Sequence, residues 1–257
     1  MAAMPATPAT PAIDLNADMG ESFGHWKLGD DELLVEHLTS ANVACGFHAG
    51  DFGVMDRTVA LCRDHGVAIG AHPGYPDLAG FGRRPIPYTP EETEQLVLYQ
   101  VGALAAFCRR HDAELRHVAA HGALFTRAAV DPAIASAVAR AVAAFSRDLA
   151  LYGLAASQPM RAAAEEAGLG FVAQGFADRR YDPDGTLQSR SVAGSLIADA
   201  EAAATQAARI VEEGRVQASD GTTITVEART VTIHGDTPNA VEIAAAIRRR
   251  LTTGTLP

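Results

Sequence analysis

The chain has 257 residues, of which 48% are hydrophobic and 20% charged, and its formal net charge is −10 at pH 7. This length and composition favour a soluble globular protein with one large core, and the negative charge opposes binding to nucleic acid or to an anionic membrane surface. The single lysine, Lys27, lies at no predicted strand end, so we expect neither Schiff-base chemistry nor a phosphate-binding lysine there. The three cysteines are far apart, with no C-x-x-C pair and no sign of a disulfide framework, which favours a reducing cytoplasm.

From the N-terminus, residues 1–12 are rich in Ala, Pro and Thr and predict a disordered tail, whereas residues 13–257 predict a single domain. Strands alternate with helices throughout this domain. The predicted strands cover residues 13–16, 40–45, 67–72, 118–121, 149–154, 170–176 and 230–234. The predicted helices cover residues 31–38, 51–65, 89–111, 131–146, 157–167, 194–213 and 237–250.

Seven strand–helix units in sequence predict an α/β fold with a closed or nearly closed (β/α) barrel. Two short strands at residues 216–218 and 223–226 predict a small β-hairpin insertion near residues 216–226. An open doubly wound sheet is the structural alternative, because alternation alone does not establish closure.

Polar side chains follow most of the predicted strands. The carboxyl ends of parallel strands meet at one end of such a fold, so four separated histidines are expected to share one pocket: His48, His72, His121 and His234. Imidazoles and carboxylates that converge there suit general acid–base catalysis or a divalent metal ion. For any one of these histidines, the alternative is a turn residue or a hydrogen-bonded core residue.

Two loops after strands carry paired arginines, Arg83-Arg84 and Arg179-Arg180. Guanidinium groups bind carboxylates or phosphates in bidentate fashion, so these loops are candidates for holding an anionic substrate. Solvated surface charge is the alternative, and we favour it for the second arginine of each pair. No P-loop, Rossmann or G-x-S-x-G motif is present, and Cys45 is predicted to be a packing residue.

Six segments in collinear order carry a resemblance to a known family. They are LNADMGESFG at residues 15–24, SANVACGFHAGD at 40–51, GAHPGYPD at 70–77, HGAL at 121–124, FADR at 176–179 and HGD at 234–236. On these motifs the chain resembles the LamB/YcsF lactam-utilisation family, the A subunits of the bacterial ATP-dependent 5-oxoprolinase.

The resemblance implies a seven-stranded β/α barrel similar to those of glycoside hydrolases and polysaccharide deacetylases. It also implies a complex with B and C subunits that opens 5-oxo-L-proline to L-glutamate while ATP is cleaved to ADP and phosphate. ATP is then a co-substrate, and a divalent metal such as Mg is possible. No nucleic acid or membrane partner is implied.

The resemblance also implies roles for individual residues. The residues expected to transfer protons and activate water are Asp18, His48, His72 and His121. The residues expected to bind substrate or nucleotide are Asn16, Gly46, Gly50, Asp51, Arg83, Gly122, Asp178, Arg179, His234 and Asp236. If a metal binds, its expected ligands are Asp14, His48, His72 and His121.

The chain departs from the family pattern at two places. It has Ala119-Ala120 where members usually carry Lys-Pro, and Gln174-Gly175 where they usually carry Glu-Val. A cation and an anion are thus missing together, which is consistent with a pair in relatives. Two alternatives to the 5-oxoprolinase role therefore remain, namely a stand-alone metal-dependent deacetylase or amidase, and a noncatalytic partner within the complex.

Overall fold

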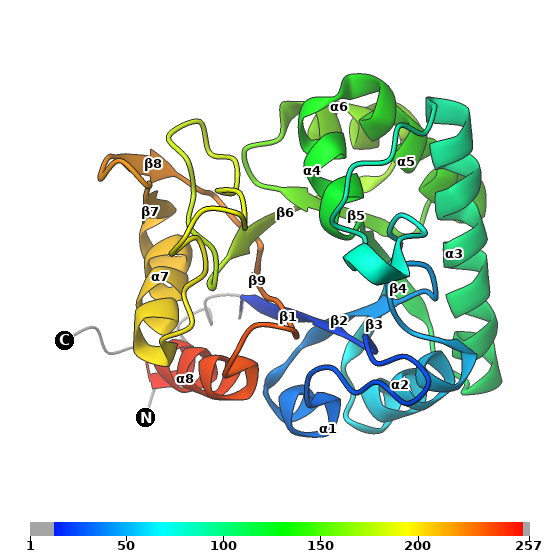
Figure 1. The fold of residues 1–257 in the computed structure, drawn as a ribbon, viewed down its shortest axis with the longest axis horizontal. Helices are drawn as coiled ribbons and strands as arrows, with labels where there is room; N and C mark the ends of the chain where they lie inside the picture. Colours follow the sequence, from blue (N-terminus) through cyan, green and yellow to red (C-terminus); the bar gives the residue numbers. More distant parts are fainter. Residues whose placement is uncertain (1–12, 254–257) are drawn as a thin grey trace, which may run out of the picture.

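A computed structural model describes residues 13–253, so the tail predicted at residues 1–12 lies outside the described part of the chain (Figure 1). Seven parallel strands close into a barrel in the order β1-β2-β3-β4-β5-β6-β9. Their bounds are β1 Asp14–Met19, β2 Ser40–Ala44, β3 Ala68–His72, β4 Leu115–Ala119, β5 Ala150–Leu154, β6 Gly170–Phe176 and β9 Thr230–Ile233. The closed barrel confirms the predicted fold and excludes the open doubly wound sheet.

Helices surround the barrel, with α3 along one side and α7 and α8 on the opposite side (Figure 1). The helices are α1 Asp31–Leu34, α2 Phe52–Asp64, α3 Pro90–Arg110, α4 Gly122–Val130, α5 Pro132–Phe145, α6 Gln158–Ala167, α7 Ala200–Glu213 and α8 Ala240–Thr253. Short 3-10 turns are η1 Val35–His37 and η2 Leu78–Gly80. The predicted hairpin is present as β7 Arg215–Gln217 and β8 Thr223–Thr225, which pair antiparallel.

The helices differ from the prediction at several places: the helix expected over residues 31–38 is α1 followed by η1, and α8 begins at Ala240 rather than at residue 237. Two further differences shape the site. Helix α4 was not predicted, because the residue before it, His121, makes no side-chain capping hydrogen bond and so leaves no N-cap signature. Helix α7 begins at Ala200 rather than near residue 194, because the Asp199 carboxylate caps it by accepting the backbone N–H of Ala202 at 2.8 Å. Residues 177–199 are therefore free to form a long irregular segment over the carboxyl end of the barrel.

Side chains alternate between the two faces of the barrel wall. On β1, Leu15, Ala17 and Met19 belong to the hydrophobic core, whereas Asn16 and Asp18 are buried polar residues that hydrogen-bond to Asn42. Strand β1 thus turns one side outward to the helices and the other inward, as barrel strands do. The interior is consequently polar, and it leads to the site described below.

Within residues 13–253, no single helix is long and apolar enough to cross a membrane. Helices α4 and α5 pass that test only when they are taken together across a 116° bend. Their apolar residues are mostly buried in the fold.

Candidate functional site

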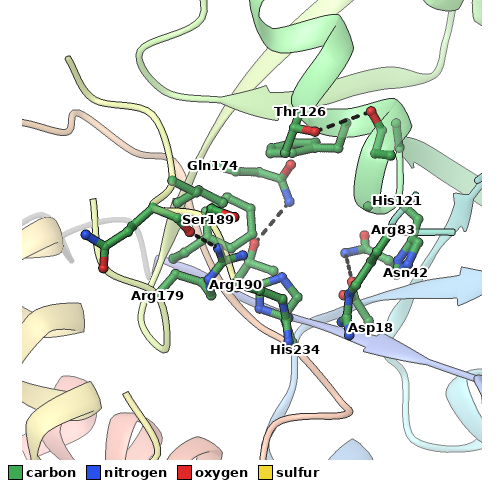
Figure 2. Close-up of a pocket in the computed structure, with 18 of the residues that line it drawn as sticks. Asp18, Asn42, Arg83, His121, Thr126, Gln174, Arg179, Ser189, Arg190 and His234 are labelled. Atoms are coloured by element: carbon green, nitrogen blue, oxygen red, sulfur yellow. Dashed lines mark hydrogen bonds between the residues drawn. The ribbon is translucent and has the colours of Figure 1, made fainter. Parts of the chain in front are cut away.

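A cavity of about 560 Å³ opens at the carboxyl ends of the barrel strands (Figure 2). Loops from both halves of the chain contribute to its wall. Residues predicted from the sequence that line it are Asp18, His72, Arg83, His121, Gly122, Arg179 and His234. The structure therefore brings together at one mouth side chains that are distant along the chain.

One wall of the cavity rests on a cluster of three buried histidines. The rings of His48 and His121 are stacked, with centroids 3.7 Å apart and planes 4° from parallel. His72 meets both rings edge-on, and its Nε2 lies 3.2 Å from Oδ1 of Asp18. His72, His121 and Asp18 line the cavity, whereas His48 lies behind them with no exposed surface.

Backbone carbonyls determine where the protons of two of these rings lie. Nδ1 of His72 is 2.7 Å from the Ala119 carbonyl, and Nε2 of His121 is 2.8 Å from the Phe81 carbonyl. Because a carbonyl only accepts, each ring donates its N–H there. In the neutral rings, Nε2 of His72 and Nδ1 of His121 are then both lone pairs, although they lie 2.9 Å apart. Only a proton or a metal cation between them makes that contact favourable.

Glu21 completes the cluster, and the sequence-based reasoning did not single it out. Its Oε1 lies 3.7 Å from Nε2 of His48 and 3.8 Å from Nδ1 of His121. Glu21 Oε1 and both ring nitrogens of His48 are buried without a hydrogen-bond partner. Buried polar atoms without partners are costly, so these three atoms favour the binding of an additional ion or molecule.

Burial and neighbouring charges shift the acid–base properties of the cluster. Burial raises the pKa of Glu21 well above its usual range, and the nearby Asp18 charge raises it further. Burial likewise lowers the pKa values of His48 and His121 well below that of free histidine. For Asp18, burial opposes ionisation, but the adjacent His72 together with His234 and His121 outweighs it, so the pKa of Asp18 falls below its usual range.

These residues fit a divalent cation. One ligand atom from each member lies within 4.8 Å of the others, and the members are Glu21, His48, His72 and His121. Neutral imidazoles with a carboxylate are a typical zinc ligand set, and ligating histidines usually donate their other N–H to a carbonyl or carboxylate, as His72 and His121 do here. The unpartnered atoms of Glu21 and His48 would gain a ligand.

Asp14, which we expected among the metal ligands, lies elsewhere. It occupies the amino end of β1, where its carboxylate accepts hydrogen bonds from the hydroxyls of Thr39 at 2.5 Å and Ser40 at 2.8 Å. Its place in the cluster is taken by Glu21, just beyond the carboxyl end of the same strand. A carboxylate after a strand end, in the same motif as Asp18, was the signal that could have identified it.

On another part of the wall, Asp178 holds His234. The Asp178 carboxylate lies 3.0 Å from Nδ1 of the His234 ring, and it also accepts the backbone N–H of His234 at 3.0 Å and the Thr237 hydroxyl at 2.6 Å. Burial alone would raise the pKa of Asp178, but His234 and these hydrogen bonds lower it below its usual value. The His234 ring, stacked on Phe176, therefore keeps Nε2 as a free lone pair in a residue that lines the cavity.

Three arginines also line the cavity. Arg83 pairs with Asp236 at 2.8 Å, and Arg190 approaches the same carboxylate at 3.6 Å. Arg179 is 6% exposed and donates to the Gln188 carbonyl at 2.5 Å. Arg190 lies in the irregular segment after β6, where no periodic pattern in the sequence indicates that its side chain reaches the cavity. The site thus contains a cation that the sequence did not reveal.

The second arginine of each pair lies outside the cavity. Arg84 forms an ion pair with Asp77, and its side chain is 66% exposed. Arg180 is exposed and donates to the Gly194 carbonyl at 2.9 Å. Both agree with the expectation of surface charge.

Some predicted site residues do not line the cavity. Asn16 lies deeper in the barrel, where its amide donates to the Ser40 hydroxyl at 2.7 Å. Asp51 caps α2 by accepting the Val54 N–H at 2.8 Å, and its other oxygen accepts the Gly24 N–H at 2.7 Å. The Asp51 carboxylate therefore links the start of α2 to the loop after β1.

Gly46 and Gly50 shape the loop between β2 and α2. Gly50 has φ of +74°, and a Cβ there would lie 2.9 Å from the Gly20 carbonyl, so the position requires glycine. Cys45 is buried at the start of this loop, and burial raises the pKa of its thiol to about 12, which agrees with a packing residue.

Comparisons with known proteins agree with the motifs. A model of the LamB/YcsF family matches residues 13–256. A protein from Chloroflexus aurantiacus, named as the A subunit of 5-oxoprolinase, is 54% identical over 239 residues, covering 93% of this chain and 94% of that protein. Another of that name from Methylococcus capsulatus is 52% identical over 245 residues, covering 95% and 94%. The crystal structure of a lactam utilization protein from Thermus thermophilus superposes with a TM-score of 0.88 at 46% identity, covering 94% of this chain and 96% of that one.

Proposed function

This chain belongs to the LamB/YcsF family, and from that premise we propose that it is the A subunit of an ATP-dependent 5-oxoprolinase. In this role it opens the ring of 5-oxo-L-proline to give L-glutamate, together with B and C subunits. One observation carries the proposal: a single cavity combines an ionised Asp18 and an oriented His234 with three arginines. That combination suits hydrolysis of a small anionic amide.

Opening a lactam needs an attacking water and a proton for the departing nitrogen. Nε2 of His234 is the base that takes the proton from water, because Nδ1 is committed to Asp178. The resulting imidazolium is stabilised by the Asp178 carboxylate and delivers the proton to the ring nitrogen. Asp18, which is kept ionised and accepts the Asn42 amide N–H at 2.9 Å, orients the attacking water.

A divalent ion fits beside this machinery. Glu21, His48, His72 and His121 would hold it. Such an ion, when bound, polarises a carbonyl and makes a nearby water more acidic. The chain's own residues then need only to orient the substrate and to move protons through His234.

ATP is a co-substrate of the proposed complex, and we assign its binding to the partner subunits. The sequence has no P-loop or Rossmann motif, and its only lysine is Lys27. We place the reaction in the cytoplasm, where the three free thiols of this chain stay reduced.

The proposal is tested by reconstituting this chain with B and C subunits and measuring glutamate formed from 5-oxoproline and ATP. Glutamate should appear only when all three chains are present. Release no greater than that of the B and C subunits alone would reject the assignment. If wild-type chain is required but variants at His234 and Asp18 remain fully active, the chain is a noncatalytic partner instead.

The buried Glu–His cluster favours a second candidate, a stand-alone metal-dependent amidase or deacetylase. That function predicts turnover of amide substrates by this chain alone with an added divalent ion and without ATP. Activity that depends strictly on ATP and the partner subunits would exclude it.

A further inference from the structure

We infer that Arg83, Arg179 and Arg190 form a subsite for a phosphoryl group, so that the cavity receives the lactam already phosphorylated on its carbonyl oxygen. This inference rests on the proposed function and specifies the substrate of the same site. The three guanidinium groups come from separate parts of the chain, Arg83 from the loop after β3, Arg179 directly after β6 and Arg190 further along the same segment. Figure 2 shows Arg179, Arg190 and Ser189 grouped at one side of the cavity.

The arginines have more donors than the surrounding protein uses. Arg179 is buried, and its Nε has no hydrogen-bond partner. Nη2 of Arg190 is also buried and comes only within 3.6 Å of Asp236, whereas Nη2 of Arg83 meets the same carboxylate at 2.8 Å. Buried donors without acceptors are costly, so Arg179 and Arg190 favour a ligand rich in acceptor oxygens.

The ion pairs of these arginines leave one guanidinium without a carboxylate partner. Within residues 13–253, Asp236 pairs with Arg83 at 2.8 Å and with Arg190 at 3.6 Å, whereas Arg179 forms no ion pair. Two other nearby carboxylates have partners of their own: Asp178 holds His234, and Asp182 accepts the Ser219 hydroxyl at 2.9 Å. Burial, and after it the neighbouring Arg190, lowers the pKa of Arg179 to about 10. A phosphoryl group brings about two negative charges and three acceptor oxygens.

Hydroxyl groups add to the subsite. Ser189 and Ser191 line the cavity next to Arg190, and their hydroxyl oxygens lie 2.9 Å apart. Hydroxyls beside guanidinium groups are common partners of phosphate oxygens. His234 and Asp18 line the same cavity, so a phosphoryl group held by the arginines would place the attached carbon near the groups that move protons.

The substrate must then be supplied by a phosphoryl transfer elsewhere in the complex. In that step the lactam oxygen attacks the γ-phosphorus of ATP, the bond to the β-phosphate oxygen breaks, ADP leaves, and the ring nitrogen loses its proton. In this cavity a water adds to the activated carbon, the ring C–N bond breaks as the nitrogen is protonated, and an acyl phosphate forms. A second water displaces inorganic phosphate and leaves glutamate.

Inorganic phosphate tests the subsite directly on the full chain, by isothermal titration calorimetry. Phosphate should bind at one site per chain, and excess acetate should compete poorly. Arg190→Gln and Arg179→Gln should each weaken binding at least about tenfold, whereas Arg209→Gln, an exposed arginine on α7, should not. Equal phosphate affinity in wild type and Arg190→Gln, or equal competition by acetate, would overturn the inference. Thermal melting of each variant establishes that it is folded.

A second measurement separates this inference from the proposed function. In the reconstituted complex, Arg190→Gln should raise the ratio of ADP formed to glutamate formed, because phosphorylated lactam is made but poorly captured. If the wild-type complex makes no glutamate, the proposed function fails, while the calorimetry still decides the subsite. If the wild-type complex makes glutamate and Arg190→Gln has the same rate, the same KM and the same ratio of ADP to glutamate, the subsite is rejected and the proposed function stands.

Discussion

The Asp178 carboxylate and Nδ1 of the His234 ring lie 3.0 Å apart, across 56 residues of sequence, because the strands that precede them, β6 and β9, are neighbours in the barrel. One Asp178 oxygen accepts both the backbone N–H of His234 and the Thr237 hydroxyl, so the carboxylate has one orientation. These contacts fix the orientation of the ring. They make His234 the candidate for proton transfer in the proposed reaction.

Asp178→Asn should lower kcat by roughly 100- to 10,000-fold with a much smaller change in KM. The asparagine oxygen is needed to accept the two hydrogen bonds at Oδ2, so its NH₂ group faces Nδ1 of His234. The imidazole proton then moves to Nε2, and the ring no longer acts as a base. Steady-state glutamate formation by the reconstituted complex measures the effect, and His65→Gln at an exposed position is the control. A full wild-type kcat in Asp178→Asn would show that His234 is not the base.

Purified chain should bind about one divalent ion, removable by chelator and measurable by elemental analysis. Glu21→Gln should lower its affinity by at least roughly 100-fold, because the variant replaces a charged ligand inside the buried cluster. Asp14→Asn is the matched control, since this carboxylate hydrogen-bonds to Thr39 and Ser40 instead. Loss of the ion in Asp14→Asn, with retention in Glu21→Gln, would contradict the ligand set.

Strand periodicity in the sequence predicts which of the candidate site residues lie close together. His72 and His121 are at or next to the ends of predicted strands, and the carboxyl ends of parallel strands necessarily converge in a barrel. Arg190 lies in an irregular segment whose path depends on tertiary packing, so no local pattern indicated it. Glu21 follows the end of β1 in the same motif as Asp18, a signal that was overlooked. The expectation that Asp14 lies among the metal ligands overlooked its height in the barrel. Period-2 alternation puts it on the same face as Asp18 but four residues lower in the barrel.

Gln174→Glu alone should destabilise the fold, and adding Ala119→Lys should offset the loss. Gln174 is buried, its amide donates to the Thr232 hydroxyl at 3.0 Å, and its Oε1 has no partner, so a carboxylate there would be poorly compensated. Ala119, two residues beyond the inward-facing His117, is a small residue on the same face of β4. We expect a coupling energy of about 1–3 kcal/mol in a double-mutant cycle measured by urea unfolding. Additive effects would show that these two positions do not form a pair.

The Asp31→Asn variant should become progressively more stable to unfolding than wild type as the pH rises. Burial raises the pKa of Asp31 from 3.8 to about 6, although its carboxylate accepts the Gly20 N–H at 2.9 Å. Because the folded pKa exceeds the unfolded one, the folded state binds more protons, and the contribution is fully present below about pH 4 and lost as pH rises through about 6. The free energy of unfolding of wild type minus that of Asp31→Asn should therefore fall by roughly 2 kcal/mol between about pH 4.5 and pH 7.5. Glu36→Gln, at an exposed carboxylate in the following turn, is the control variant. A difference in the free energy of unfolding between wild type and Asp31→Asn that does not depend on pH would contradict the raised pKa of Asp31.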